Sequence, residues 1–147
     1  MASSRRPAYL LDTNVLVHLI RGGPLAEAID ARFGLRAGLA RAMVSVVTVG
    51  ELRSLALQLG WGKRKRAELA KLTGAVVVVD INRPEVLDAY AELDDFSRRA
   101  GRSPGKNDLW IAATARATGA VLLTTDKDFD HLTGDLLQRH WIDPAPA

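Results

Sequence analysis

The stretch Tyr9-Leu10-Leu11-Asp12-Thr13-Asn14-Val15-Leu16 carries one acidic residue between two apolar segments. Residues 9–11 form a short apolar run that predicts a buried strand. Residues 14–20 predict a helix that stops at the turn Arg21-Gly22-Gly23-Pro24. A strand followed at once by a helix is the start of a βαβ unit. Asp12 therefore lies at the junction, where the strand ends and the helix begins.

The same order of short apolar strand and helix recurs along the chain. Further strands are predicted at residues 43–47, 76–79 and 121–124, with an edge strand around 140–142. Further helices are predicted at residues 25–41 (weakened at Gly34 and Gly38), 48–59, 63–72, 109–118, and from Pro84 to about Ala100. The continuous apolar run at 76–79 is typical of a strand covered on both faces. This alternation predicts an α/β fold, a three-layer α/β/α sandwich with a central parallel sheet.

Composition predicts one soluble globular domain spanning residues 1–147, with residues 1–7 as a flexible leader. The chain is 48% hydrophobic and 25% charged, and no apolar run approaches the roughly 18 residues that span a membrane. No cysteine is present, which excludes disulfides and thiolate metal sites. The absence of cysteine fits a reducing compartment, so we expect a cytoplasmic protein without a membrane partner.

The net charge is +3, from 20 basic and 17 acidic residues. If four acids share one site, the remainder carries 20 − (17 − 4) = +7. A basic body around a local acidic hole suits a polyanionic substrate. A mildly basic, solvated surface explains the same charge equally well, so charge alone leaves both interpretations open.

Four acidic residues lie where a predicted helix or tight turn begins, and each has a purely structural explanation. Asp12 fits the N-cap of the helix that follows it, and Glu51 fits a capping box with Thr48. Asp108 lies in a first helical turn, where negative charge complements the helix dipole, and Asp126 fits an Asx-turn. Because such positions prefer these residue types, the spacing alone is weak evidence for a site.

The combination of acids is more informative than any one of them. Asp12 and Asp126 follow apolar strands, and the carboxyl ends of parallel strands converge on one crevice. Asp108 opens an apolar helix, so it should also lie near buried surface. Clustered carboxylates repel one another, and the expected reason to gather them is a hard cation bound through oxygen. The polar residues available to orient them are Asn14, Asn107, Thr124 and Thr125.

Four segments resemble the motifs of PIN domains, and most of all those of the toxin ribonucleases of VapBC-type toxin–antitoxin pairs. They are Leu11-Asp12-Thr13-Asn14-Val15-Leu16, Val49-Gly50-Glu51-Leu52, Lys106-Asn107-Asp108-Leu109-Trp110-Ile111-Ala112-Ala113-Thr114-Ala115 and Leu123-Thr124-Thr125-Asp126-Lys127-Asp128-Phe129. Each motif is short and unspecific, but four in family order are specific. The resemblance covers nearly the whole chain.

The resemblance implies a parallel sheet between helices and a Mg²⁺- or Mn²⁺-dependent endoribonuclease that hydrolyses RNA phosphodiester bonds. It also implies homodimers and inhibition by a cognate antitoxin protein. Carried over to this sequence, the catalytic and metal-binding acids are Asp12, Glu51, Asp108 and Asp126. Asn14 and Thr125 are the supporting polar residues. The sequence leaves open whether Asp126, Asp128 or Asp130 is the fourth ligand.

Basic residues offer two candidate RNA contacts. The first group leads directly into the third motif and comprises Arg98, Arg99, Arg102 and Lys106, in a segment (98–106) predicted as a basic loop. The second is the run 63–66, for which a solvated helix face is the simpler interpretation.

Two rival functions use the same scaffold. One is a related PIN-like nuclease that acts in RNA processing or on DNA. The other is a non-catalytic scaffold that binds RNA or protein, which the complete acidic set disfavours. The sequence contains no Walker loop and no Gly-x-Ser-x-Gly elbow, which lowers the case for nucleotide cofactors and serine hydrolases.

Overall fold

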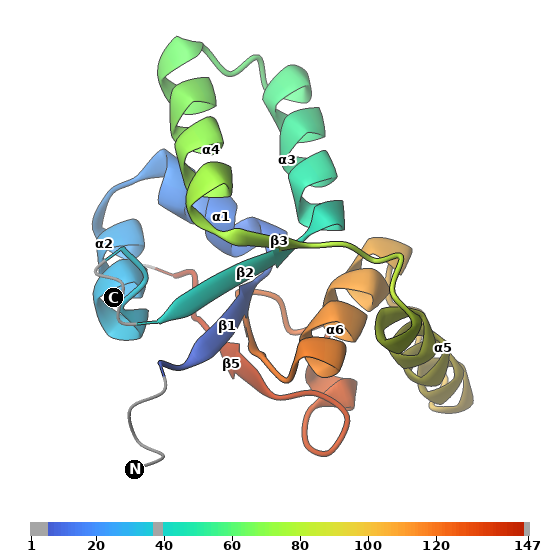
Figure 1. The fold of residues 1–147 in the computed structure, drawn as a ribbon. Helices are drawn as coiled ribbons and strands as arrows, with labels where there is room; N and C mark the ends of the chain where they lie inside the picture. The colour runs from blue at the N-terminus through green and yellow to red at the C-terminus, as the bar shows by residue number, and fades with distance from the viewer. Residues whose placement is uncertain (1–5, 37–39, 146–147) are drawn as a thin grey trace.

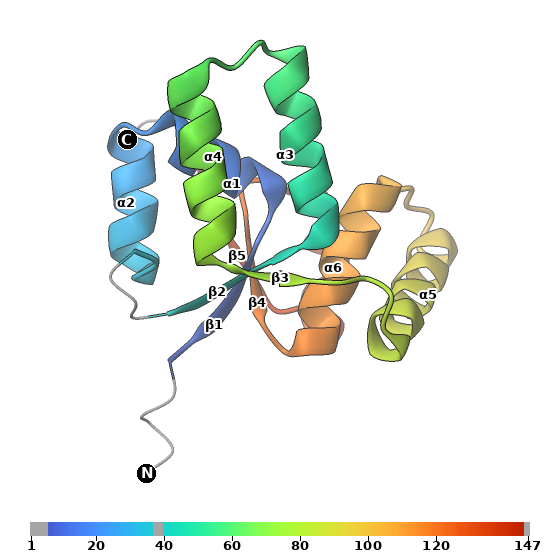
Figure 2. The same ribbon diagram turned by 45° about the horizontal axis from the view of Figure 1, so that its top comes forward.

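A five-stranded parallel sheet lies between two layers of helices in the computed structural model, which describes residues 6–36 and 40–145 (Figures 1 and 2). The strand order is β3-β2-β1-β4-β5, and every neighbouring pair is parallel. The strands are β1 (Ala8–Leu11), β2 (Arg41–Ser45), β3 (Val77–Val79), β4 (Val121–Thr124) and β5 (Arg139–Trp141). The predicted three-layer α/β/α sandwich is confirmed.

The two helical layers enclose two separate hydrophobic cores. The helices packed in the first core are α1 (Thr13–Arg21), α2 (Pro24–Phe33), α3 (Val46–Gln58) and α4 (Lys63–Ala75), and those in the second are α5 (Pro84–Arg99) and α6 (Lys106–Thr118). Leu10 of β1 packs in the second core, whereas Leu11 packs in the first. Successive strand residues point to opposite faces, so the central strands need continuous apolar runs.

The start of α3 differs from the sequence prediction. The Ser45 hydroxyl accepts a hydrogen bond from the Val47 amide at 3.1 Å, which makes Ser45 the N-cap. The helix therefore begins at Val46, so residues 46 and 47 are helical rather than part of a strand. The predicted capping box between Thr48 and Glu51 is wrong, because Glu51 lies in the second turn of α3.

Helix α2, strand β2 and helix α5 also have bounds that differ from the sequence prediction. Helix α2 ends at Phe33 because Gly34 adopts a left-handed conformation (φ 64°), and β2 begins at Arg41; residues 37–39, including the predicted weak point at Gly38, lie outside the described residues. Helix α5 continues through Arg99, so the basic loop between α5 and α6 comprises only residues 100–105.

Strand β3 is not covered on both faces, contrary to prediction. It pairs with β2 alone and forms an edge of the sheet. Val77 is 61% exposed and Val78 is 44% exposed. An apolar run predicts a strand, but whether that strand is central or at an edge depends on the order of the strands in the sheet.

The chain enters β1 through a short segment without regular secondary structure. Residues 1–5 of the predicted leader lie outside the described residues, and Arg6 and Pro7 precede β1 without regular secondary structure. Among the described residues, no helix combines the length and the apolar character that a bilayer crossing requires.

Candidate metal centre

The predicted acidic residues meet at the carboxyl edge of the sheet. Strands β1 and β4 are neighbours in the sheet, with Leu11 opposite Leu123, so the residues that follow them also lie together. The Asp12 amide donates to the Leu123 carbonyl at 2.9 Å and extends this pairing by one residue. Helices α3 and α6 bring Glu51 and Asp108 to the same edge within their first two turns.

Asp12 is both a helix cap and a member of the acidic group. Its Oδ1 accepts from the Thr13 amide at 2.8 Å, and its Oδ2 accepts from the Thr124 hydroxyl at 2.7 Å. Only 3% of the residue is exposed. Burial raises the pKa of Asp12 to about 6, and the charges of Asp126 and Glu51 add to the effect, while the two hydrogen bonds oppose it. Asp12 is the N-cap of α1, as predicted, but capping alone does not explain why a carboxylate is buried at an electrostatic cost.

The Glu51 carboxylate joins α3 to α1 and α6. Its Oε1 accepts from the Thr13 hydroxyl at 2.6 Å, and its Oε2 accepts from the Asn107 amide nitrogen at 3.2 Å. The Thr13 hydroxyl also lies 3.1 Å from the Thr48 hydroxyl. Both oxygens of Glu51 are therefore oriented by residues from other helices.

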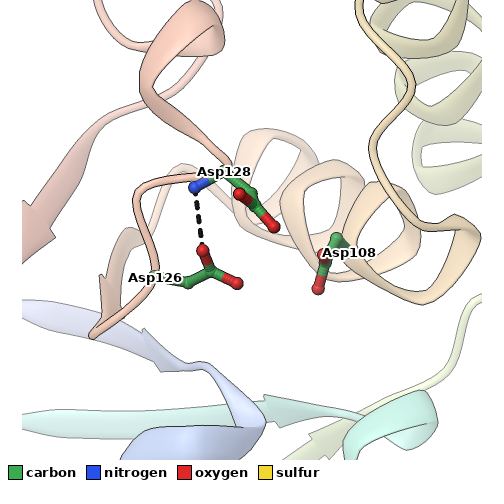
Figure 3. Close-up of side chains that lie close together, drawn as sticks. All are labelled: Asp108, Asp126 and Asp128. Carbon is green, nitrogen blue, oxygen red and sulfur yellow. Dashed lines mark hydrogen bonds between the residues drawn. The ribbon is translucent and has the colours of Figure 1, made fainter.

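Three carboxylates form the tightest cluster. Asp108, Asp126 and Asp128 each offer an oxygen, and these oxygens lie within 4.8 Å of one another (Figure 3). Asp108 comes from α6, and the other two come from the turn after β4, where Asp126 Oδ1 accepts from the Asp128 amide at 2.9 Å. This is the predicted Asx-turn. Burial raises the pKa of Asp108 to about 7, followed in effect by the surrounding carboxylate charges.

Asp130, the remaining candidate for the fourth acidic ligand, is not part of this cluster. Asp130 lies in a short 3₁₀ helix (Asp130–Leu132), and its carboxylate accepts a hydrogen bond from Arg139. Asp126 and Asp128 both face Asp108, so the turn contributes two carboxylates to the cluster and Asp130 contributes its charge to an ion pair.

Thr124 connects two of the acids through one hydroxyl. The Thr124 Oγ1 donates to Asp12 and accepts from the Asp126 amide at 3.0 Å. Of the two predicted supporting residues, Thr125 uses its carbonyl to accept from the Trp141 indole, and Asn14 lines the adjoining pocket. Thr124 was predicted only as one of several available polar residues, and Thr13 was not predicted, although it directly follows Asp12 in the first motif.

The adjoining pocket has a volume of about 660 Å³ and opens over α3. Its acidic wall contains Asp12, Glu51 and Asp108, and its far side follows one face of α3 as far as Gln58. The donors at this site are oxygens, without thiolate or imidazole in the cluster. An all-oxygen set with several carboxylates fits a hard divalent cation such as Mg²⁺ or Mn²⁺.

The four predicted RNA contacts fall into two groups. Arg98 and Arg99 pair with acids one turn earlier in α5, at 3.1 Å to Asp94 and 3.0 Å to Asp95. Arg102 instead lines a second pocket that also contains Asp128, and Lys106 is the exposed first residue of α6. The run 63–66 forms the first turn of α4 and is mostly exposed, as a solvated face would be.

A parallel α/β sandwich with clustered acids at its carboxyl edge defines a class of α/β proteins that can hold a divalent cation at the ends of their strands. Residues 9–135 match the family model for the PIN domain, and the chain belongs to this family. Ribonuclease VapC1 of Haemophilus influenzae (strain R2866) is 31% identical over 134 residues, which cover 90% of this chain and 97% of that protein. VapC ribonuclease Y4jK of Sinorhizobium fredii is 34% identical over 125 residues, with 80% and 86% covered.

A solved complex has the same fold. The structure of VapBC-1 from nontypeable Haemophilus influenzae superimposes with a TM-score of 0.71 at 29% identity, and the match covers 91% of this chain and 97% of that one. The comparison therefore extends over essentially the whole described fold.

Proposed function

We propose that this chain is a divalent-metal-dependent endoribonuclease that hydrolyses RNA phosphodiester bonds as the toxin of a type II toxin–antitoxin pair. The observation that carries the proposal is the convergence of Asp12, Glu51, Asp108 and Asp126 from four distant segments onto one edge of the sheet. Membership of the PIN family and the similarity to VapC ribonucleases support the same reaction.

The proposed metal ligands are these four acids, together with Asp128. Two of them have raised pKa values, which means that the folded chain resists carrying all its negative charges without a cation. A bound Mg²⁺ or Mn²⁺ would supply positive charge that lowers the pKa of water and stabilises the charge that develops on the phosphate. The residues of the chain orient the acids: Thr13 and Asn107 hold Glu51, and Thr124 holds Asp12.

The proposed partners are the RNA substrate, an antitoxin protein and a second copy of the chain. Support for the antitoxin comes from VapBC-1 of Haemophilus influenzae and from VapBC-5 of Mycobacterium tuberculosis, a solved member of the VapBC family of toxin–antitoxin systems. Arg102 and Lys106 are the preferred phosphate contacts, because Arg98 and Arg99 already have acidic partners in their own helix. The cytoplasm remains the expected compartment, supported by the absence of cysteine.

The test compares cleavage of a mixed-sequence RNA pool and single-stranded DNA by the wild type, Asp108→Asn and Asp95→Asn. Asp95 is an exposed acid of α5 whose ion pair contributes little, so Asp95→Asn is the matched control. We expect Mg²⁺-dependent RNA cleavage by the wild type and the control, and a loss of about 100-fold or more in Asp108→Asn. Equal cleavage by Asp108→Asn would refute the assignment. Cleavage of DNA alone would favour the DNA-directed rival, and RNA binding without cleavage would favour the scaffold.

A further inference from the structure

A second, polar pocket borders the acidic cluster on the side away from α3. Its volume is about 320 Å³, and it lies between the loop that joins α5 to α6 and the turn that follows β4. Asp128 belongs both to this pocket and to the three-carboxylate cluster, so the two sites share a wall. The volume is at the small end of the roughly 300–1,000 Å³ range of ligand sites, which suits one small group rather than a folded segment.

Arg102 supplies the first cation of this pocket. Its backbone amide donates to the Ser97 carbonyl at 2.8 Å, which fixes the loop just after α5. Arg102 and His131 both line the pocket, Arg102 from the loop before α6 and His131 from the segment that follows the turn after β4. Within residues 6–36 and 40–145, Arg102 forms no ion pair of the kind that occupies Arg98 and Arg99.

Lys127 supplies the second cation, from the turn between Asp126 and Asp128. Its Nζ lies 4.5 Å from the centroid of the Trp141 ring. The Trp141 indole in turn donates to the Thr125 carbonyl at 3.1 Å, which fixes the ring. A cation–π contact orders the ammonium without neutralising its charge. Lys127 therefore lines the pocket with its ammonium ordered beside Trp141.

Two acids also line the pocket, and each has a partner elsewhere. Asp130 forms an ion pair with Arg139, and Asp128 offers an oxygen to the three-carboxylate cluster. The His131 Nε2 lies 2.9 Å from the Ser97 hydroxyl, and the ring also bonds to the Asp128 backbone, so the turn is anchored to α5. In the part of the chain that the structure describes, no side chain caps the start of α6 at Gly105. The free amides at the N-terminus of this helix favour an anion.

We propose that this second pocket is a subsite for an RNA phosphate that flanks the phosphate being cut, held by Arg102 and Lys127. The inference rests on the proposed nuclease function, which places the cut at the neighbouring acids. A single RNA strand carries one negative charge per nucleotide, so a strand that crosses the acidic cluster must bring a second phosphate beside it. Two positioned cations next to that cluster match this second charge, whereas a neutral ligand would gain nothing from them.

The experiment measures cleavage of the mixed-sequence RNA pool by Arg102→Gln, Lys127→Gln and the matched control Arg32→Gln. Arg32 is an exposed cation that also lies over an aromatic ring, Phe33, but on α2 in the other helical layer (Figures 1 and 2). We expect each pocket variant to raise KM about tenfold with kcat within about twofold of the wild type. Each should also reduce the slope of log KM against log salt by about 0.7, because one phosphate contact is lost.

The outcomes separate the subsite from the nuclease function. RNA cleavage with KM and salt slope equal to those of Arg32→Gln would overturn the subsite and leave the nuclease in place. A fall in kcat at unchanged KM would also overturn it, because it would indicate a structural role. If the wild type binds but does not cut RNA, the nuclease proposal falls, and anisotropy with 5′-labelled RNA decides the subsite: equal binding by all three variants overturns it, and weaker binding by the two pocket variants alone supports it. Absence of both binding and cleavage overturns both.

Discussion

Replacing Asp12 by asparagine tests whether this residue is a metal ligand under electrostatic strain or only the cap of α1. The pKa of Asp12 is about 6 in the folded chain against an ordinary value of 3.8. Between these two pH values the folded state keeps a proton that the unfolded state has released, so stability falls as the pH rises. Above about pH 6 the full cost remains, about 3 kcal/mol at 1.36 kcal/mol for each pKa unit.

Asparagine carries no charge and avoids this cost. It keeps one oxygen to accept from the Thr13 amide but loses the acceptor that the Thr124 hydroxyl uses, which costs about 1 kcal/mol. The expected net gain of Asp12→Asn in EDTA at pH 8 is about 2 kcal/mol, or about 4–8 °C in Tm for a chain of this size. At pH 5 the gain should fall below about 1 kcal/mol, because much of the cost is already relieved.

The assay is thermal and urea unfolding at pH 5 and pH 8, with EDTA or with Mg²⁺. Saturating Mg²⁺ should reverse the order, since an ion at 100 times its Kd stabilises the wild type by about 2.7 kcal/mol, whereas a variant with about 100-fold weaker affinity gains only about 0.4 kcal/mol. The matched control is Asp80→Asn, which follows β3 and accepts from the Asn82 amide at 3.0 Å but is exposed. An Asp12→Asn variant that is less stable than the wild type at pH 8 in EDTA would refute the reasoning. That result is expected if Asp12 is only an N-cap without electrostatic strain, because replacing such a cap can only lower the free energy of unfolding.

Three further predictions concern the same edge of the sheet. Thr124→Val should lower the free energy of unfolding in urea by about 1–2 kcal/mol and lower kcat, because Asp12 and Asp126 lose their shared hydroxyl. Thr124→Ser keeps the hydroxyl and should retain both stability and kcat. An inactive serine variant would contradict this role. Mg²⁺ binding at pH 6.5 should release protons, because Asp108 has a pKa of about 7 and must lose its proton to bind the ion. The measurement is the dependence of the calorimetric binding enthalpy on the ionisation enthalpy of the buffer. Asp108→Asn should release fewer protons, and an unchanged number would contradict the role of Asp108 as a ligand. Ser45→Ala should cost about 1 kcal/mol because it removes the cap of α3, whereas the exposed Ser54→Ala in the same helix should change stability by less than about 0.5 kcal/mol; equal effects would show that the cap is not used.

Local patterns were sufficient for β4 but not for β2. Residues 121–124 were predicted with the observed bounds of β4, because both faces of that strand are buried and the run lies between the glycine at position 119 and the polar pair Thr125-Asp126. The boundary at Ser45 was misplaced because Val46 and Val47 are apolar and β-branched and so extend the apolar run of the strand, although neither residue is buried at the start of α3. The informative signal there was the serine, a common N-cap, and not the valines.

Long-range features could not be derived from periodicity. The exposure of Val77 depends on β3 being an edge strand, and no local pattern specifies strand order. The proximity of Asp108 to Asp126 and Asp128 depends on how α6 packs beside β4. The order of the four motifs anticipated this group, but only coordinates could separate Asp128 from Asp130 or identify Thr13 as a partner of Glu51.

The acids that meet at the sheet edge are spread from residue 12 to residue 128, and they come from the ends of two strands and from helices on both sides of the sheet. During synthesis on the ribosome, the set is complete only after β4 and its following turn have emerged and both layers have docked. An interrupted chain that stops before residue 126 lacks the last carboxylates altogether. If the proposed nuclease function holds, an unfinished copy of this chain would lack part of its cation site and would not cut RNA before its release from the ribosome.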